Sequence, residues 1–119
     1  MGEMPLLKLF NSFFEMYNGG GSSFYFKDVL KITENNIFNS IFKDEKDIEI
    51  LNSKIKSLNI TYLSKKFVKS LKLSKIDVFF EMTRKSIIDD LLGFADLCEE
   101  KLDMDIYYDQ LVSLRKVLF

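Results

Sequence analysis

Three aspartates near the carboxyl end of the chain, Asp103, Asp105 and Asp109, have the spacing of oxygen ligands in a calcium-binding loop. A loop of the EF-hand type also needs an oxygen donor at position 107, a glycine at 108 and a glutamate at 114. Those positions hold Tyr107, Tyr108 and Leu114. The pattern therefore fails as a calcium site, and capping of a last helix explains Asp103 or Asp105 better. We expect no bound metal.

Catalytic and cofactor chemistry is limited by the side chains that are missing. The 119 residues contain no histidine, which removes imidazole as a base, as the partner of a nucleophile and as a zinc ligand. Cys98 is the only cysteine, and its place on an apolar helical stripe favours a structural role. Gly19-Gly20-Gly21 lacks the lysine of a phosphate-binding loop. The sequence therefore predicts a protein that is not an enzyme and carries no cofactor.

Charge is the most informative pattern. Residues 50–76 contain 7 lysines and no acid, whereas residues 77–109 contain 10 acids and 3 basic residues. A formal net charge of −1 thus conceals a block of charge +7 beside a block of charge −7 (3 − 10). A nucleic-acid backbone would approach the first block and a basic protein the second. The two blocks could instead neutralise each other within one fold or across a homodimer.

The lysine-rich segment also has the order of a DNA-binding helix-turn-helix. A helix over 44–58, a tight turn at 58–60 and a second helix over 61–71 follow one another. Residues 61–75 would then contact phosphates and bases. The candidate nucleic-acid-binding residues are Thr61, Lys65, Lys66, Lys69, Lys72 and Lys75.

Within that segment, Tyr62-Leu63-Ser64-Lys65-Lys66-Phe67 resembles the second-helix region of AraC-type bacterial regulators. Their linking helix would correspond to residues 75–92, with Arg84 and Leu91-Leu92 in roughly the expected places. The resemblance spans residues 48–92 and implies a DNA-binding transcriptional regulator. Three features depart from that family: the turn lacks its small residue and proline, the alignment needs a one-residue slip, and a second motif would use the acidic segment around 103–105, which phosphates repel.

Residues 1–18 are predicted to form an amphipathic helix with aromatic side chains on its apolar stripe. Such side chains resemble the anchors of a helix that binds in a partner's groove, and they would equally complete the core of the chain's own bundle. The candidate protein-binding residues are Phe10, Phe13, Phe14 and Tyr17. The glycines and serines of 19–23 predict a flexible joint, natural or engineered, which would let the helix dock in trans, exchange between protomers or pack on its own domain.

The remainder, 24–119, is predicted to be one helical domain. Helical spacing indicates short helices over 23–32 and 33–42, although the alternation in Phe24-Tyr25-Phe26 leaves a strand open there. Ser74 and Asp77 have the spacing of a capping box and would start a long helix over 75–101, about 40 Å in length. The predicted fold class is therefore all-α, a compact bundle of roughly five to seven helices.

The N-terminus lacks a basic segment followed by a small-residue cleavage site, and no apolar run approaches about 20 residues. We therefore expect a cytoplasmic protein that does not enter a membrane. Amphipathic helices and opposed charge blocks suit binding better than chemistry. The first hypothesis is a non-enzymatic interaction protein, an adaptor, inhibitor or immunity-type module that occupies a partner protein's surface, with a homodimer left open. The alternative is the helix-turn-helix regulator using 61–75.

Overall fold

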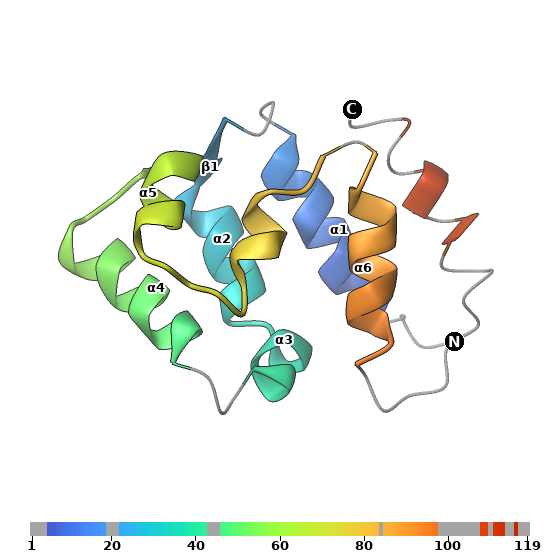
Figure 1. Cartoon of the computed structure of the whole chain (residues 1–119), viewed down its shortest axis with the longest axis horizontal. Coiled ribbons are helices and arrows are strands. Elements are labelled where there is room, and N and C mark those ends of the chain that lie inside the picture. The colour runs from blue at the N-terminus through green and yellow to red at the C-terminus, as the bar shows by residue number, and fades with distance from the viewer. Residues whose placement is uncertain are drawn as a thin grey trace.

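Helices dominate the computed structural model, which describes residues 5–18, 22–42, 46–83, 85–97, 108–109, 111–113 and 116 (Figure 1). The α-helices are α1 (Pro5–Tyr17), α2 (Phe26–Thr33), α3 (Asn36–Ile41), α4 (Asp47–Ser57), α5 (Lys65–Ser70) and α6 (Ile87–Ala95). Two short strands, β1 (Ser23–Tyr25) and β2 (Tyr62–Ser64), and a 3-10 helix, η1 (Asp77–Phe80), complete the described elements. The prediction of a compact, mostly helical protein is confirmed, and the strand pair corrects the expectation of a purely all-α fold.

None of the helices in the described part of the chain has both the length and the apolar character needed to cross a membrane.

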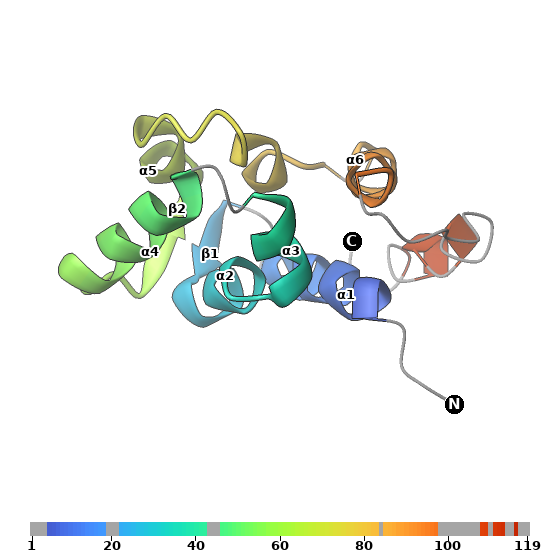
Figure 2. The ribbon, with the colours of Figure 1, turned by 90° about the horizontal axis from the view of Figure 1, so that it is seen from below.

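The first helix supplies the centre of the core. α1 packs against α2 and α3, and α6 lies above α1 in the view of Figure 2. Phe10, Phe13 and Phe14 are 0 % exposed, which confirms that this stripe is buried. Helical spacing alone explains why, since residues three and four apart share one face.

An aromatic cluster joins elements that are far apart in the sequence. The ring of Phe79 in η1 lies 5.3 Å from Phe13 of α1, 5.2 Å from Phe38 of α3 and 5.6 Å from Phe94 of α6, measured between centroids. These separations are typical of stabilising aromatic pairs. Phe79 therefore anchors residues 77–80 at the meeting point of three helices.

The predicted helix over 61–71 is corrected at its start, where the chain is extended. β2 pairs antiparallel with β1, and Phe24 lies opposite Leu63. Both of these side chains are 0 % exposed, whereas Tyr62 and Ser64 face outward. Alternation of this kind is the signature of a strand. The helix begins only at Lys65, where the Ser64 hydroxyl oxygen accepts a hydrogen bond from the Phe67 amide at 3.0 Å and caps α5.

The long helix predicted over 75–101 is wrong for its described residues. Helical structure is limited to η1 and α6, and residues 98–101 lie outside the described part. Ser74 does not cap a helix; the Asp47 carboxylate accepts the Lys75 amide hydrogen instead, at 2.9 Å. Before α6, Thr83 and Ser86 exchange hydrogen bonds: the Thr83 amide donates to Ser86 Oγ at 2.8 Å, and the Ser86 amide donates to Thr83 Oγ1 at 3.1 Å. This local pairing stabilises a turn where the apolar spacing alone suggests a continuous helix.

A buried tyrosine holds the segment between η1 and α6 away from helical geometry. The Tyr17 hydroxyl donates to the Phe79 carbonyl oxygen at 2.6 Å and accepts from the Met82 amide at 3.0 Å. Both backbone groups thus use a side chain of α1 in place of a helical partner. A tertiary contact of this kind overrides the helical pattern of the sequence.

Candidate functional site

The seven lysines of residues 50–76 lie on the elements at one end of the molecule. They lie on α4, on α5 and in the turns after α5. These elements occupy the left of Figure 1, whereas α6 with its acids lies on the right. We call this set the lysine surface; it consists of Lys54, Lys56, Lys65, Lys66, Lys69, Lys72 and Lys75. All seven side chains are exposed. Among the described residues, the lysines of α4 and α5 are therefore separated in space from the acids of α6, whereas Asp77 of η1 lies near the lysines.

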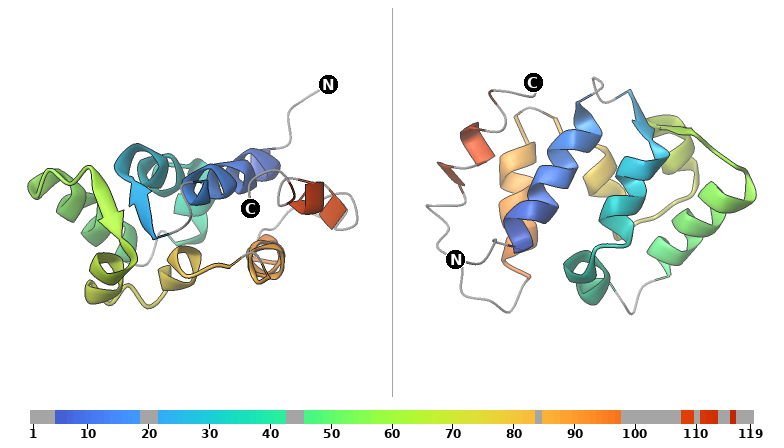
Figure 3. Two further views of the ribbon diagram at one scale, coloured as in Figure 1. Left: turned by 90° about the horizontal axis from the view of Figure 1, so that it is seen from above. Right: turned by 180° about the vertical axis from the view of Figure 1, so that it is seen from behind.

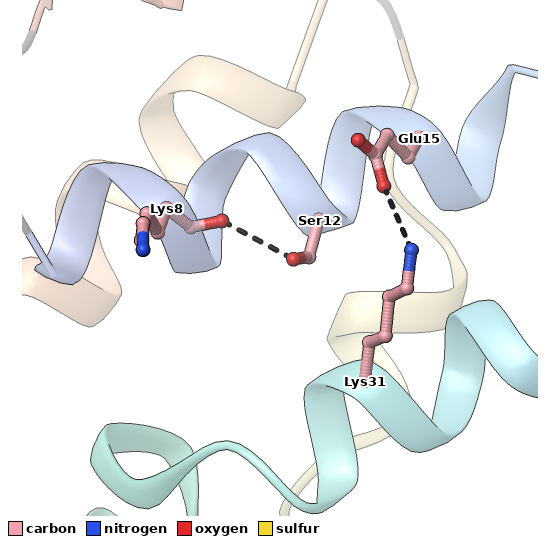
Figure 4. Close-up of polar contacts among 4 residues, drawn as sticks. All are labelled: Lys8, Ser12, Glu15 and Lys31. Atoms are coloured by element: carbon pink, nitrogen blue, oxygen red, sulfur yellow. Dashed lines mark hydrogen bonds and ion pairs between the residues drawn. The ribbon is translucent and has the colours of Figure 1, made fainter.

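No residue of the lysine surface forms an ion pair with another described residue. Lys31 of α2 pairs with Glu15 of α1 at 3.5 Å, away from this surface (Figure 4). Both members of that pair are about half exposed, so its contribution to stability is small. Within the described residues, the two charge blocks do not neutralise each other through ion pairs.

The candidate nucleic-acid residues lie on three consecutive pieces of chain. Thr61 precedes β2, Lys65, Lys66 and Lys69 belong to α5, and Lys72 and Lys75 follow in turns. All six are exposed, but α5 has only 6 residues. At 1.5 Å per residue it is about 9 Å long, which is short for a helix that reads a DNA groove.

The candidate protein-binding residues occupy the opposite environment. Phe10, Phe13 and Phe14 are 0 % exposed and Tyr17 is 2 % exposed, all within the chain's own core. The structure therefore places these four aromatic side chains where the core interpretation expects them. A docking role in trans would require α1 to leave that core.

Aromatic side chains beside the lysine surface were not singled out from the sequence. Tyr25 of β1 lies opposite Tyr62 of β2 in the strand register, and their ring centroids are 5.5 Å apart. Phe26, the first residue of α2, lies 5.1 Å from Tyr25 by the same measure. We call these residues the aromatic trio. The alternation of side chains in 24–26 and 62–64 is the sequence signal for this site, because it places Tyr25 and Tyr62 on the outer face of the strand pair.

A hollow of about 370 Å³ adjoins the trio between α2 and the end of α4. Its apolar lining comes from Phe26, Leu30, Ile55 and Ile60, and its polar lining from Lys56, Asn59 and Thr61. Asn59 has a φ of 52°, the left-handed conformation that lets the chain turn sharply from α4 toward β2. This turn brings Lys56 of the lysine surface to the same hollow as Phe26 of the trio.

Asp77 is a carboxyl group near the lysine surface whose surroundings disfavour its ionised form. Its Oδ1 atom is buried without a hydrogen-bond partner among the described residues. Burial raises the pKa of Asp77 above its ordinary value, and the carboxylates of Glu81 and Asp47 add to the rise. A backbone hydrogen bond at Leu73 and the charge of Lys69 oppose it. A carboxyl group in this position destabilises the fold when it ionises.

Asp77→Asn should therefore raise the thermal midpoint at pH 7. A folded-state pKa above the unfolded-state value means that stability is lost as the pH rises through the interval between them. Removing the ionisation removes that loss, and the two proteins should differ little near about pH 3, where both states are mostly protonated. Thermal melts at both pH values make this comparison. A lower midpoint for the variant at pH 7 would contradict it.

No group of three acidic, histidine or cysteine side chains in the described residues is arranged to hold a metal ion. Asp103, Asp105 and Cys98 lie outside the described residues, and Asp109 is exposed.

Comparisons with protein-family models, with curated proteins and with solved structures find no match. Inference of function therefore depends on the lysine surface and its neighbours.

Proposed function

We propose that this chain is a non-enzymatic helical binding protein whose lysine surface contacts the phosphate backbone of a nucleic acid. The observation that carries the proposal is that seven exposed lysines gather at one end without forming an ion pair with any other described residue. Like charges held together repel one another, so such a cluster favours an anionic partner with repeated charges. Nucleic acid supplies one phosphate per nucleotide, with release of counterions as the lysines bind.

The acidic residues at α6 add direction to this binding. Asp89 of α6 and Asp96 directly after it are exposed, and α6 lies at the opposite end of the molecule from α4 and α5 (Figure 3). A polyanion is attracted to one end of the molecule and repelled by the other. The net charge of −1 therefore does not argue against binding, because the local field near the lysines has the opposite sign.

A partner protein stays the second candidate, through exposed apolar residues rather than through α1. Ile50 and Leu58 on and after α4 are 40 % and 56 % exposed, and they flank the lysines of that helix. An acidic protein with an apolar patch would suit this surface. The aromatic side chains of α1 do not support the hypothesis, since they are committed to the core.

The finer proposal of a helix-turn-helix regulator rests on the order α4, turn, α5 and on the resemblance to AraC-type proteins. The shortness of α5 and the strand before it favour contact with the backbone over readout of base sequence. We therefore propose nucleic-acid binding without assigning a sequence-specific site.

Lys65→Glu combined with Lys66→Glu should weaken nucleic-acid binding by about a hundredfold or more at low salt, because two attractive charges become repulsive. Both residues start α5, where acidic side chains favour the helix, so the fold should be retained. Fluorescence anisotropy with labelled oligonucleotides, at salt concentrations from about 50 to 200 mM, measures affinity and salt dependence together. Loss of two phosphate contacts should lower the salt slope by about two.

Lys85→Glu combined with Lys116→Glu is the matched control, since it makes the same charge change at exposed positions outside the lysine surface. It should bind nearly as the unchanged protein does. If the unchanged protein binds no single-stranded or duplex oligonucleotide at the lowest salt, the proposal is wrong. If polyglutamate competes as well as nucleic acid does, an acidic protein partner becomes the better explanation.

A further inference from the structure

We infer that the nucleic acid is single-stranded and that its unpaired bases stack on Tyr62 and enter the hollow beside the aromatic trio. This inference rests on the proposed function and names the class of nucleic acid for the same surface.

The strand pair places aromatic rings on its outer side. Phe24 and Leu63 face the core at 0 % exposure, so their neighbours Tyr25 and Tyr62 face the other way. Because Tyr25 and Tyr62 are directly opposed in the register, their rings lie on the same outer face of the sheet. Tyr62 is 64 % exposed, the most exposed of the large apolar side chains described.

The exposure of Tyr62 has no explanation within the described fold. Neither the Tyr25 hydroxyl nor the Tyr62 hydroxyl forms a hydrogen bond with another described residue, and the side chain of Tyr62 is largely in water. An aromatic ring held in a strand loses little conformational entropy when a planar ligand covers it. A nucleobase is such a ligand, and any base can stack because each one has a π-face.

Lysines precede and follow these aromatic residues in the sequence. Lys65 and Lys66 directly follow β2, and Lys27 follows Phe26 at the start of α2. On the other side, Lys56 lines the hollow together with Phe26. A groove that combines positive charge with aromatic stacking surfaces is the recurrent way in which proteins bind unpaired strands.

The hollow has the size and lining for an inserted base. Its volume of about 370 Å³ lies at the lower end of pockets that hold small molecules. Apolar side chains form much of its lining, and Asn59 and Thr61 supply hydrogen-bonding groups at its polar part. A base that stacks near Phe26 would thus find polar atoms for its edge and Lys56 for the adjoining phosphate.

A duplex would use this surface poorly. Its bases are paired and stacked on one another, so a protein ring outside the helix cannot reach their faces. Reading base edges would require an element that enters a groove, and α5 spans only about 9 Å. The lysines alone would hold a duplex, whereas a single strand would engage both the lysines and the rings.

Tyr62→Thr tests this inference, because threonine removes the ring and keeps a residue suited to a strand. We expect the unchanged protein to bind a single-stranded oligonucleotide at least about tenfold more tightly than a duplex of equal length. The variant should lose about tenfold in single-strand affinity and change duplex affinity by less than about twofold. Tyr62→Phe should retain single-strand binding, since stacking needs the ring rather than the hydroxyl.

Tyr108→Ala is the matched control, because Tyr108 is also exposed, at 48 %, and lies outside the lysine surface. Intrinsic tyrosine fluorescence supplies a second readout: it should be quenched by the single strand in the unchanged protein and much less in Tyr62→Thr. Equal affinity for duplex and single strand, or an unchanged affinity of Tyr62→Thr, would overturn the inference. If the lysine reversal still abolishes binding in that case, the proposed function stands without it. If no nucleic acid binds the unchanged protein, both the proposed function and this inference are wrong.

Discussion

Replacing Phe13 and Phe14 together with alanine should leave the chain largely unfolded at room temperature. Both side chains are 0 % exposed, and the ring of Phe13 lies 5.3 Å from Phe79 and 6.0 Å from Phe38. Each buried Phe→Ala change typically costs about 3–5 kcal/mol. The pair would remove an amount comparable to the whole stability of a small domain, about 5–15 kcal/mol. Circular dichroism during urea unfolding measures the loss.

Ile50→Ala combined with Leu58→Ala is the control for that experiment, because it also truncates two apolar side chains, both of them exposed. Its free energy of unfolding should stay within about 0.5 kcal/mol per site. The result also tests the role of α1. A Phe13/Phe14 variant that melts like the unchanged protein but loses a partner or a dimer would make α1 a docking helix instead of a core helix.

Tyr17→Phe should lower the free energy of unfolding by roughly 2–4 kcal/mol, although it removes a single oxygen atom. That oxygen is bonded to the Phe79 carbonyl at 2.6 Å and to the Met82 amide at 3.0 Å, in a buried setting. Phenylalanine would leave both backbone groups without a partner inside the core. An unpaired buried group costs about 1–3 kcal/mol.

Tyr25→Phe serves as the comparison, since the Tyr25 hydroxyl has no hydrogen-bond partner among the described residues. Its stability should be nearly unchanged in the same urea titration. Burial also raises the pKa of Tyr17 well above its ordinary value, so its hydroxyl keeps its proton at alkaline pH. A loss of stability below 1 kcal/mol for Tyr17→Phe would mean that water or a shift of the segment satisfies the two backbone groups.

Two of the predictions from local spacing agree with the structure. The predicted apolar stripe of α1 is buried, and the predicted helix over 44–58 contains α4, whose Ile48, Leu51 and Ile55 lie in the core. A helix of this length has several turns, so the 3.6-residue spacing of its apolar side chains can be recognised within that segment alone. The sequence also locates the lysine surface, because a run of one charge sign must be solvated wherever it lies.

The structural features that depend on contacts between distant parts of the chain were not predicted correctly. Three-residue strands are too short for a reliable period, and the partner of Tyr25 is Tyr62, far along the chain. The long helix over 75–101 fails because the Phe79 carbonyl oxygen accepts a hydrogen bond from the Tyr17 hydroxyl and the Met82 amide donates one to it. No local pattern indicates these two contacts. For the same reason the alternation in 24–26 and 62–64 does not by itself indicate the aromatic trio, because Tyr62 joins Tyr25 and Phe26 only through the strand pairing.

That strand pairing also governs when the site can exist. Ser23 and Ser64 are brought opposite each other only after the intervening chain, which contains α2, α3 and α4, has closed into a loop. Closing a long loop costs conformational entropy that local helix formation does not repay, so non-local pairings of this kind form late in folding. A partly folded chain would carry its lysines and attract phosphates, yet it would lack the surface on which bases stack. The discrimination between unpaired and paired strands that we propose would therefore require the completed fold, and its loss would be an early functional sign of incomplete folding.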